Sequence, residues 1–363
     1  MIKFYDLYRQ DKDKHKNIIK EISKSFKHGD FILGSKLADF EKKFAKYCGS
    51  KFAIGCGNGT DALTMSLKIL DLPKNSEVLI PAMTYCSTAF AVINANLKPV
   101  LIDIEGDSPN MDLNLIKKKI TKKTRVIMPV HLYGSVVNID KLKKLIKNTN
   151  IKIIDDCSQA HGAEYKNKRK VGSLADISCF SLYPGKNLGA YGDAGIITTN
   201  NKKYYIKLIK FRNLGSGKKF IHEYIGFNSR LDNIQSIILL NKLKSLDKYN
   251  KMRKEIANFY NKNIQNKYIK KLKYSTNSVF HQYVILVKKK KKFTKLLKKN
   301  KIGFSFHYPY PINKLKALTK MYEKQKFNNS EKLANDGISI PIDPNLSKKD
   351  VSFIVNTINS YVP

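Results

Sequence analysis

Short apolar runs rich in Ile and Val alternate with amphipathic stretches along the first half of the chain. Runs of about five such residues are typical of strands buried on both faces of a sheet. The predicted strands are Lys51–Gly55, Glu77–Ile80, Lys98–Asp103, Arg125–Val130, Ile151–Asp155, Asp176–Phe180 and Gly195–Thr199. The predicted helices between them are Asp61–Leu70, Thr84–Ala95, Asn114–Lys119 and Asp140–Lys147. This alternation predicts an α/β fold with a mostly parallel seven-stranded sheet, in which ligands bind at the carboxyl ends of the strands.

The pattern changes in the second half of the chain. Ile234–Asn261 has apolar positions at helical spacing and predicts one or two long helices. A short strand at Gln282–Val287 follows, with basic helices that end in Lys348–Tyr361. We therefore expect two domains. Residues 1–240 form a large α/β domain with an N-terminal helical segment, and residues 241–363 form a smaller C-terminal α/β domain.

Charge is the outlying feature of the composition. The 363 residues carry a net charge of +39, almost all of it from lysine. Such a charge makes a lysine-rich nucleic-acid-binding or regulatory protein one alternative. Arginine is rare, however, and the sequence contains no helix-turn-helix, zinc-finger or RNA-binding motif. Lysine on solvated helix faces is therefore the favoured explanation, and we expect no nucleic-acid partner.

Cysteine usage and the absence of long apolar stretches limit the classes of protein to which the sequence can belong. The five cysteines include no CxxC pair and no His/Cys spacing typical of zinc ligands, so we expect no metal. An odd number of cysteines and a highly charged N-terminus predict a reducing, cytoplasmic location without a signal peptide. No apolar stretch is long enough to span a membrane, so no membrane association is expected.

A glycine loop, Gly55–Gly59, stands between a predicted strand and a predicted helix. Backbone N–H groups at such a helix N-terminus suit a phosphate, which is favoured over glycines that merely make a tight turn between strand and helix. The dinucleotide motif GxGxxG would need glycine where Thr60 stands. A nicotinamide oxidoreductase is therefore a weaker alternative.

Two further motifs follow predicted strands. Asp155 and Asp156 end the strand that begins at Ile151, and they must point to opposite sides of it. One of them either caps the next helix or holds a proton on a bound cation. Lys186 lies in an apolar, glycine-rich loop, where burial would favour the neutral amine that a Schiff base requires. A phosphate cradle, a carboxylate and such a lysine together match the needs of pyridoxal phosphate.

With these residues in view, the chain resembles the DegT/DnrJ/EryC1/StrS family of sugar aminotransferases from about Phe31 to the C-terminus. The motifs that carry the resemblance are Phe31–Gly34, Asn58–Leu63, Val130–Gly134, Asp155–Gly162, Phe180–Gly189 and Gly226–Asp232. The resemblance implies an aspartate-aminotransferase-like fold, fold type I, with pyridoxal phosphate as cofactor.

The resemblance also implies roles for residues at matching positions. Lys186 forms the Schiff base and moves the proton, and Asp156 pairs with the pyridinium nitrogen. Gln159 bonds the ring hydroxyl, and Tyr85 stacks on the ring. The donors to the phosphate are Gly59, Thr60 and Ser181, with Asn228 reaching the phosphate of the neighbouring subunit. The candidate substrate contacts are Tyr183, His307 and Tyr308.

The implied activity is amination of a nucleotide-linked keto-sugar of the keto-deoxyhexose type, with glutamate as donor, by a homodimer with shared active sites. Asn58–Leu63 slightly favours C-3 over C-4. A same-fold sugar dehydratase or lyase is an alternative, but a dehydratase branch has His where this chain has Lys186. Two positions depart from the family. Asp155 replaces a common Glu, and Asn313 replaces the His of a Pro-x-His element.

Overall fold

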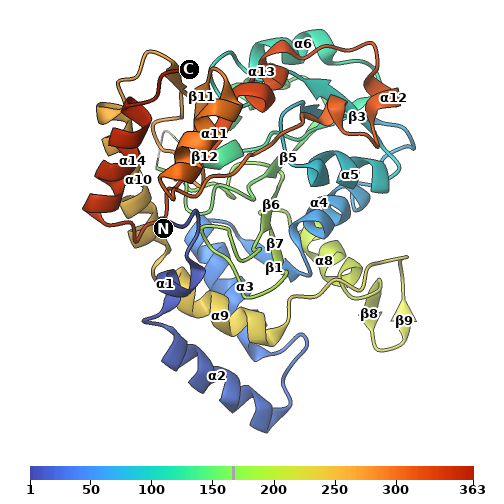
Figure 1. Ribbon diagram of the computed structural model, residues 1–363. Helices are drawn as coiled ribbons and strands as arrows, with labels where there is room; N and C mark the ends of the chain where they lie inside the picture. Colours follow the sequence, from blue (N-terminus) through green and yellow to red (C-terminus); the bar gives the residue numbers. More distant parts are fainter. Residues whose placement is uncertain (166–167) are drawn as a thin grey trace.

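A seven-stranded sheet forms the centre of the folded molecule (Figure 1). The computed structural model describes residues 1–165 and 168–363. The strands of the sheet are β1 (Phe52–Cys56), β2 (Glu77–Pro81), β3 (Lys98–Ile102), β4 (Thr124–Ile127), β5 (Lys152–Asp156), β6 (Ile177–Ser181) and β7 (Gly195–Thr199). They lie in the order β1-β7-β6-β5-β4-β2-β3, and only the pairs of β7 with β1 and β6 are antiparallel. The predicted mostly parallel sheet is confirmed, and each strand begins within one residue of its expected start.

Helices cover both faces of this sheet. They are α3 (Ser35–Cys48), α4 (Gly59–Lys68), α5 (Cys86–Asn94), α6 (Ile116–Lys119), α7 (Ile139–Leu145), α8 (Lys202–Phe211) and α9 (Asn233–Leu243), with short 3-10 turns η1 (Leu113–Leu115) and η2 (Leu132–Gly134). Leu79 of β2 packs in the core formed with α3 and α7, whereas its neighbours Val78 and Ile80 pack in the core formed with α4, α5 and α8. Because successive side chains face opposite cores, the central residues Val78, Leu79 and Ile80 are all apolar, as the sequence pattern predicted.

A smaller antiparallel sheet lies in the C-terminal part of the chain. Its strands and the remaining C-terminal elements are α10 (Leu246–Asn263), β10 (Ile269–Lys271), β11 (Tyr283–Val287), α11 (Lys290–Lys299), η3 (Ile312–Lys314), α12 (Thr319–Tyr322), α13 (Asn328–Asp336), β12 (Gly337–Ile340) and α14 (Lys348–Asn359). Ile312 and Phe327 pack in a core of the large sheet rather than in that of the small one. The division at residues 240 and 241 falls within α9 and stays a prediction.

Two peripheral segments extend from the large sheet. At the N-terminus, α1 (Leu7–Asp11) and α2 (His15–His28) lie beside α9, and Ile2 forms a bridge with Ile302 of the C-terminal part. A hairpin of β8 (Ser216–Lys218) and β9 (Ile221–His222) projects from the body of the molecule (Figure 1). Among the described residues, no helix combines the length and apolarity needed to cross a membrane.

Replacing Phe44 by Ala tests the packing of α3 on the large sheet. The Phe44 side chain is 0% exposed and its ring meets that of Phe180 edge-on at 5.1 Å. The cavity left by the ring should lower the free energy of unfolding by about 3–5 kcal/mol, measured by urea denaturation. Phe259→Ala is the matched control, because Phe259 is 40% exposed. Equal losses in the two variants would show that this core does not hold the helix.

Candidate active site

A cavity of about 750 Å³ opens at the carboxyl ends of the strands of the large sheet. Asp156 and Ser181 end β5 and β6, and Gly59 begins α4 just after β1. The predicted site residues that line the cavity are Gly59, Thr60, Tyr85, Asp156, Gln159, Ser181, Tyr183, Lys186, His307 and Tyr308. The fold therefore brings together residues that lie far apart along the chain.

One end of the cavity is the N-terminus of α4. Asn58 caps the helix, and its Oδ1 accepts a hydrogen bond from the Asp61 backbone at 2.8 Å. The first turn still has backbone N–H groups without intrahelical partners, and these groups suit an anion. A Cβ on Gly59 would lie 2.6 Å from the Cβ of Ser181, so glycine is required for this close approach of α4 and β6. The arrangement fits the phosphate of a cofactor.

Asp156 is buried on the cavity side of β5. Thr88 Oγ1 donates to its Oδ2 at 3.1 Å, and the Ser158 N–H donates to its Oδ1 at 3.1 Å. These bonds fix the carboxylate, and its oxygens can still accept a further proton-bearing group. Asp155 contacts groups outside the cavity. The two acids thus point to opposite sides of β5, and the role of Asp156 toward a bound cation stays a prediction.

Lys186 lies in the loop after β6 and lines the same cavity. Burial lowers the pKa of its amine from 10.5 to about 8, and the negative charge of Asp156 opposes part of this shift. A neutral amine is the form that attacks an aldehyde. The cavity therefore makes Lys186 far more nucleophilic near neutral pH than an exposed lysine.

Three histidines near this loop stay neutral. Burial, followed by the charge of Lys186, lowers the pKa of His161 to about 3 and that of His307 to about 4. The same two causes hold the pKa of His281 well below its ordinary value. A neutral imidazole carries one N–H and one acceptor nitrogen, so each ring can donate one hydrogen bond and accept one.

Gln159 links the large sheet to the C-terminal wall of the cavity. Its Oε1 accepts from the Tyr133 backbone N–H at 2.7 Å, and its Nε2 donates to the Tyr308 hydroxyl at 2.9 Å. One amide hydrogen remains for a ligand, so its expected bond to a ring hydroxyl stays a prediction. Tyr85 is 53% exposed, and its ring lies 5.4 Å from that of Tyr308.

Two positions that the sequence singled out lie away from the cavity lining. Asn228 is exposed and forms a bridge with Asn213, so its contact with a neighbouring subunit stays a prediction. Asn313, at the position where histidine was expected from the resemblance, is buried and donates to Glu331 Oε1 at 3.0 Å. Asn313 thus contributes to packing rather than to the cavity surface.

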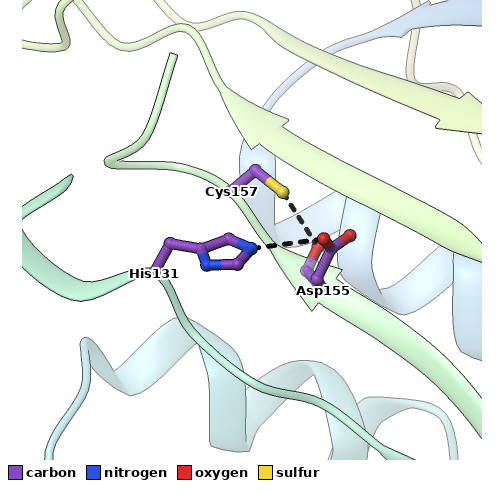
Figure 2. A group of neighbouring side chains, drawn as sticks. All are labelled: His131, Asp155 and Cys157. Carbon is purple, nitrogen blue, oxygen red and sulfur yellow. Dashed lines mark hydrogen bonds and ion pairs between the residues drawn. The ribbon is translucent and has the colours of Figure 1, made fainter. Parts of the chain in front are cut away.

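Behind the cavity, His131, Asp155 and Cys157 form a fully buried group (Figure 2). His131 Nδ1 accepts from the Val137 backbone, so its proton is on Nε2, which donates to Asp155 Oδ2 at 3.2 Å. Tyr165 donates to the same oxygen at 3.1 Å, and the Cys157 thiol bonds the Asp155 carbonyl. The group therefore anchors a buried carboxylate next to Asp156. The spacing along the chain did not predict it.

Sequence reasoning also missed part of the cavity lining. The missed residues are Tyr5, Asn58, Asp61, Leu63, Thr84, Ser87, Val130, Ser158, Gly185, Asp193, His281 and Gln282. Asn58 stands between two glycines and Ser158 two residues after Asp156, so their places within recognised motifs were a usable indication. Tyr5, His281 and Gln282 come from segments without any motif, so the sequence alone gave no reason to place them at the site.

The fold and this cavity together define an aminotransferase of fold type I. The chain belongs to the DegT/DnrJ/EryC1/StrS aminotransferase family, whose model matches residues 12–359. Membership confirms the resemblance predicted from the sequence, and it confirms pyridoxal phosphate as the cofactor.

Curated relatives cover almost the whole chain. A dTDP-3-amino-3,6-dideoxy-alpha-D-galactopyranose transaminase of Aneurinibacillus thermoaerophilus is 40% identical over 99% of both chains. A UDP-2-acetamido-2-deoxy-3-oxo-D-glucuronate aminotransferase of Pseudomonas aeruginosa is 33% identical over 98% of both chains.

Solved structures agree with the fold. DesV of S. venezuelae, in complex with a ketimine intermediate, has a TM-score of 0.96 at 30% identity and covers 100% of this chain and 99% of its own. NtdA of Bacillus subtilis, with bound cofactor PMP, has a TM-score of 0.92 at 27% identity and covers 98% of this chain and 84% of its own. The likeness to DesV confirms the predicted fold type I.

His131→Leu tests the buried group behind the cavity. The change removes one donor to a carboxylate that is 0% exposed, and leaves Tyr165 as its remaining side-chain donor among the described residues. Losing a hydrogen bond to a buried charged group in this way should lower the free energy of unfolding by about 1.5–3 kcal/mol, measured by chemical denaturation. His28→Leu, at an exposed position, is the control. A loss no larger than that of the control would contradict the anchoring role.

The pH dependence of Lys186 acylation tests its lowered pKa. Below about pH 8 most of its amine is protonated and reacts slowly, and above about pH 8 most of it is neutral. Trace acetylation of the cofactor-free protein, read by peptide mass spectrometry, should therefore reach half its maximum at Lys186 near pH 8. An ordinary lysine amine titrates near about 10.4.

Asp156→Asn provides the matched variant for this titration. It removes the negative charge that raises the pKa of Lys186, so the acylation midpoint should move to lower pH. A wild-type midpoint near that of ordinary lysines, or an upward shift in the variant, would refute the assignment of these two groups.

Proposed function

We propose that this chain transfers an amino group between glutamate and C-3 of a nucleotide-linked keto-sugar of the keto-deoxyhexose type, forming a deoxyamino sugar. The transamination follows from the family. The choice of C-3 rests on relatives that the chain matches over nearly its whole length, whose names carry a 3-amino or 3-oxo sugar. Lys186 stands where a dehydratase would have histidine, which favours transfer over dehydration.

The observation that carries the proposal is the juxtaposition of Lys186, Asp156 and the N-terminus of α4 in one cavity. Pyridoxal phosphate, when bound, supplies an aldehyde and an electron-withdrawing ring. The backbone of Gly59 and Thr60 and the hydroxyl of Ser181 would hold its phosphate. Asp156 would hold the proton on its ring nitrogen.

Lys186 does the acid–base work. Its Nζ removes the proton from the substrate carbon that bears the amino group, and returns that proton in the reverse direction. The pKa of about 8 keeps both protonation states of the amine available near neutral pH. Asp156 stays fixed by Thr88 and Ser158 during these transfers, because neither bond involves the moving proton.

The second copy of the chain belongs to this proposal. The exposed Asn228 follows the projecting β8–β9 hairpin, which has strongly exposed apolar residues such as Phe220 at 84%. A homodimer in which this segment meets the neighbouring cavity would cover that surface and bring Asn228 to a phosphate. The active sites would then be shared.

The test uses the cofactor-loaded protein with glutamate and, separately, with dTDP-3-amino-3,6-dideoxy-α-D-galactose. Each amino compound should change the absorbance of the bound cofactor, and the sugar should yield glutamate when 2-oxoglutarate is present. Lys186→Ala should slow both conversions by at least about 10²–10⁴-fold, the usual contribution of a positioned proton-transfer group. Lys291→Ala, on the exposed face of α11, is the matched control.

Two results would overturn the proposal. One is a wild-type protein that reacts with glutamate but not with the amino sugar, which would exclude this substrate class. The other is a Lys186→Ala protein as fast as the Lys291→Ala control, which would exclude the proposed base.

A further inference from the structure

The N-terminal segment of the chain forms part of the cavity wall. Tyr5 lines the cavity, although no recognised motif includes it. The segment is held from several sides. The Asp6 backbone donates to Asp343 Oδ2 at 3.3 Å, and the buried Asp11 pairs with Lys242 Nζ at 2.8 Å. These contacts therefore hold Tyr5 in a fixed position, although it lies near the end of the chain.

A directed chain of hydrogen bonds begins at two backbone carbonyls near Lys186. Asn250 Nδ2 donates to the His161 carbonyl at 2.8 Å, and Asn187 Nδ2 donates to the Val279 carbonyl at 3.2 Å. Carbonyls can only accept, so both amide groups are oriented. Asn187 Nδ2 also donates to Asn250 Oδ1 at 2.8 Å, and its Oδ1 faces His281.

This orientation sets the tautomer of His281. Asn187 Oδ1 can only accept, so His281 Nδ1 carries the hydrogen and donates it at 3.0 Å. The low pKa of His281 keeps the ring neutral, so its Nε2 is an acceptor. Gln282 Nε2 lies 3.5 Å from that nitrogen, so an amide N–H faces the acceptor. The opposite orientation of Gln282 would set its amide oxygen against a lone pair.

The chain of hydrogen bonds ends at Tyr5. Gln282 Nε2 also bonds the Tyr5 hydroxyl, which is therefore the acceptor of that bond. Within the parts of the chain that the structure describes, the Tyr5 hydroxyl hydrogen meets no acceptor. Burial raises the pKa of Tyr5, so the hydrogen stays in place at neutral pH. A single free donor is thus presented from a cavity-lining residue.

We propose that Tyr5 is a specificity-determining residue whose hydroxyl donates a hydrogen bond to an oxygen of the sugar of the nucleotide-linked substrate. Gln282 is the positioning residue that turns this hydrogen toward the ligand. The inference rests on the proposed function, because it takes a hydroxyl-rich sugar as the ligand of this wall. Glutamate lacks that part of the substrate and does not need the donor.

Tyr5→Phe removes the hydroxyl and keeps the ring. The cofactor-loaded protein is mixed with dTDP-3-amino-3,6-dideoxy-α-D-galactose or with glutamate, and the absorbance of the bound cofactor is followed. Both amino compounds convert the same enzyme form, so their rates compare directly. Tyr5→Phe should lower the second-order rate constant for the sugar by about 5- to 10-fold, as expected for one lost hydrogen bond. The rate with glutamate should stay within about twofold.

Tyr8→Phe is the matched control, because Tyr8 is exposed on α1 and does not line the cavity. It should leave both rates unchanged. An unchanged sugar rate in Tyr5→Phe, or an equal loss with glutamate, would overturn the assignment of Tyr5. If the wild-type protein reacts with glutamate and not with the sugar, the proposed function and this inference both fail, and the wild type alone reveals it.

Gln282→Glu tests the direction of the hydrogen bonds. A carboxylate cannot donate to Tyr5 and would instead accept its hydrogen, which removes the donor from the cavity. Gln282→Glu should therefore slow the sugar reaction about as much as Tyr5→Phe does. The double variant should be no slower than either single variant, because both remove the same donor. Losses that multiply in the double variant would refute the coupling between the two residues.

Discussion

The loss of water around the amine of Lys186 is the constraint on which the rest of the site depends. Burial disfavours the charged form, and Asp156 offsets part of that cost. The two groups are useful only because each has the other nearby. A lysine without the acid would lose more of its charge near neutral pH, and a carboxylate without a cation would be buried at a cost in stability. The ends of β5 and β6 must therefore be placed as a unit.

That placement explains why two successive acids have different surroundings. Alternation along β5 sends Asp156 into the cavity and Asp155 into the layer behind it. Asp155 needs donors because it is fully buried, and His131 and Tyr165 supply them. The His131 backbone N–H also bonds the Asp156 carbonyl at 3.1 Å. The buried group thus supports the position of the acid that faces the cavity.

The sequence was sufficient for the features set by short-range pattern. The strands of the large sheet were predictable because they are apolar runs buried on both faces. The position of the cavity, at the carboxyl ends of these strands, followed from the predicted parallel topology. Lys186 and Asp156 were recognisable from glycine and acid motifs beside strand ends. The place of Tyr5 in the cavity wall was not predictable, because the position of the N-terminal segment depends on long-range contacts such as the ion pair between Asp11 and Lys242. The His131 group was missed for the same reason, because only the pairing of β4 with β5 brings its members together.

Long-range hydrogen bonds of this kind also carry direction, which pair distances alone do not show. Side-chain amides and neutral imidazoles can each be turned either way, so a network made only of them would have two polarities. Backbone carbonyls remove that freedom, because they accept and never donate. The carbonyls of His161 and Val279 fix the orientation of the amide groups of Asn250 and Asn187. The direction of the hydrogen bonds is then set in turn at His281, Gln282 and Tyr5. The loop that contains Lys186 therefore influences the N-terminal part of the cavity wall through the direction of these hydrogen bonds as well as through their positions.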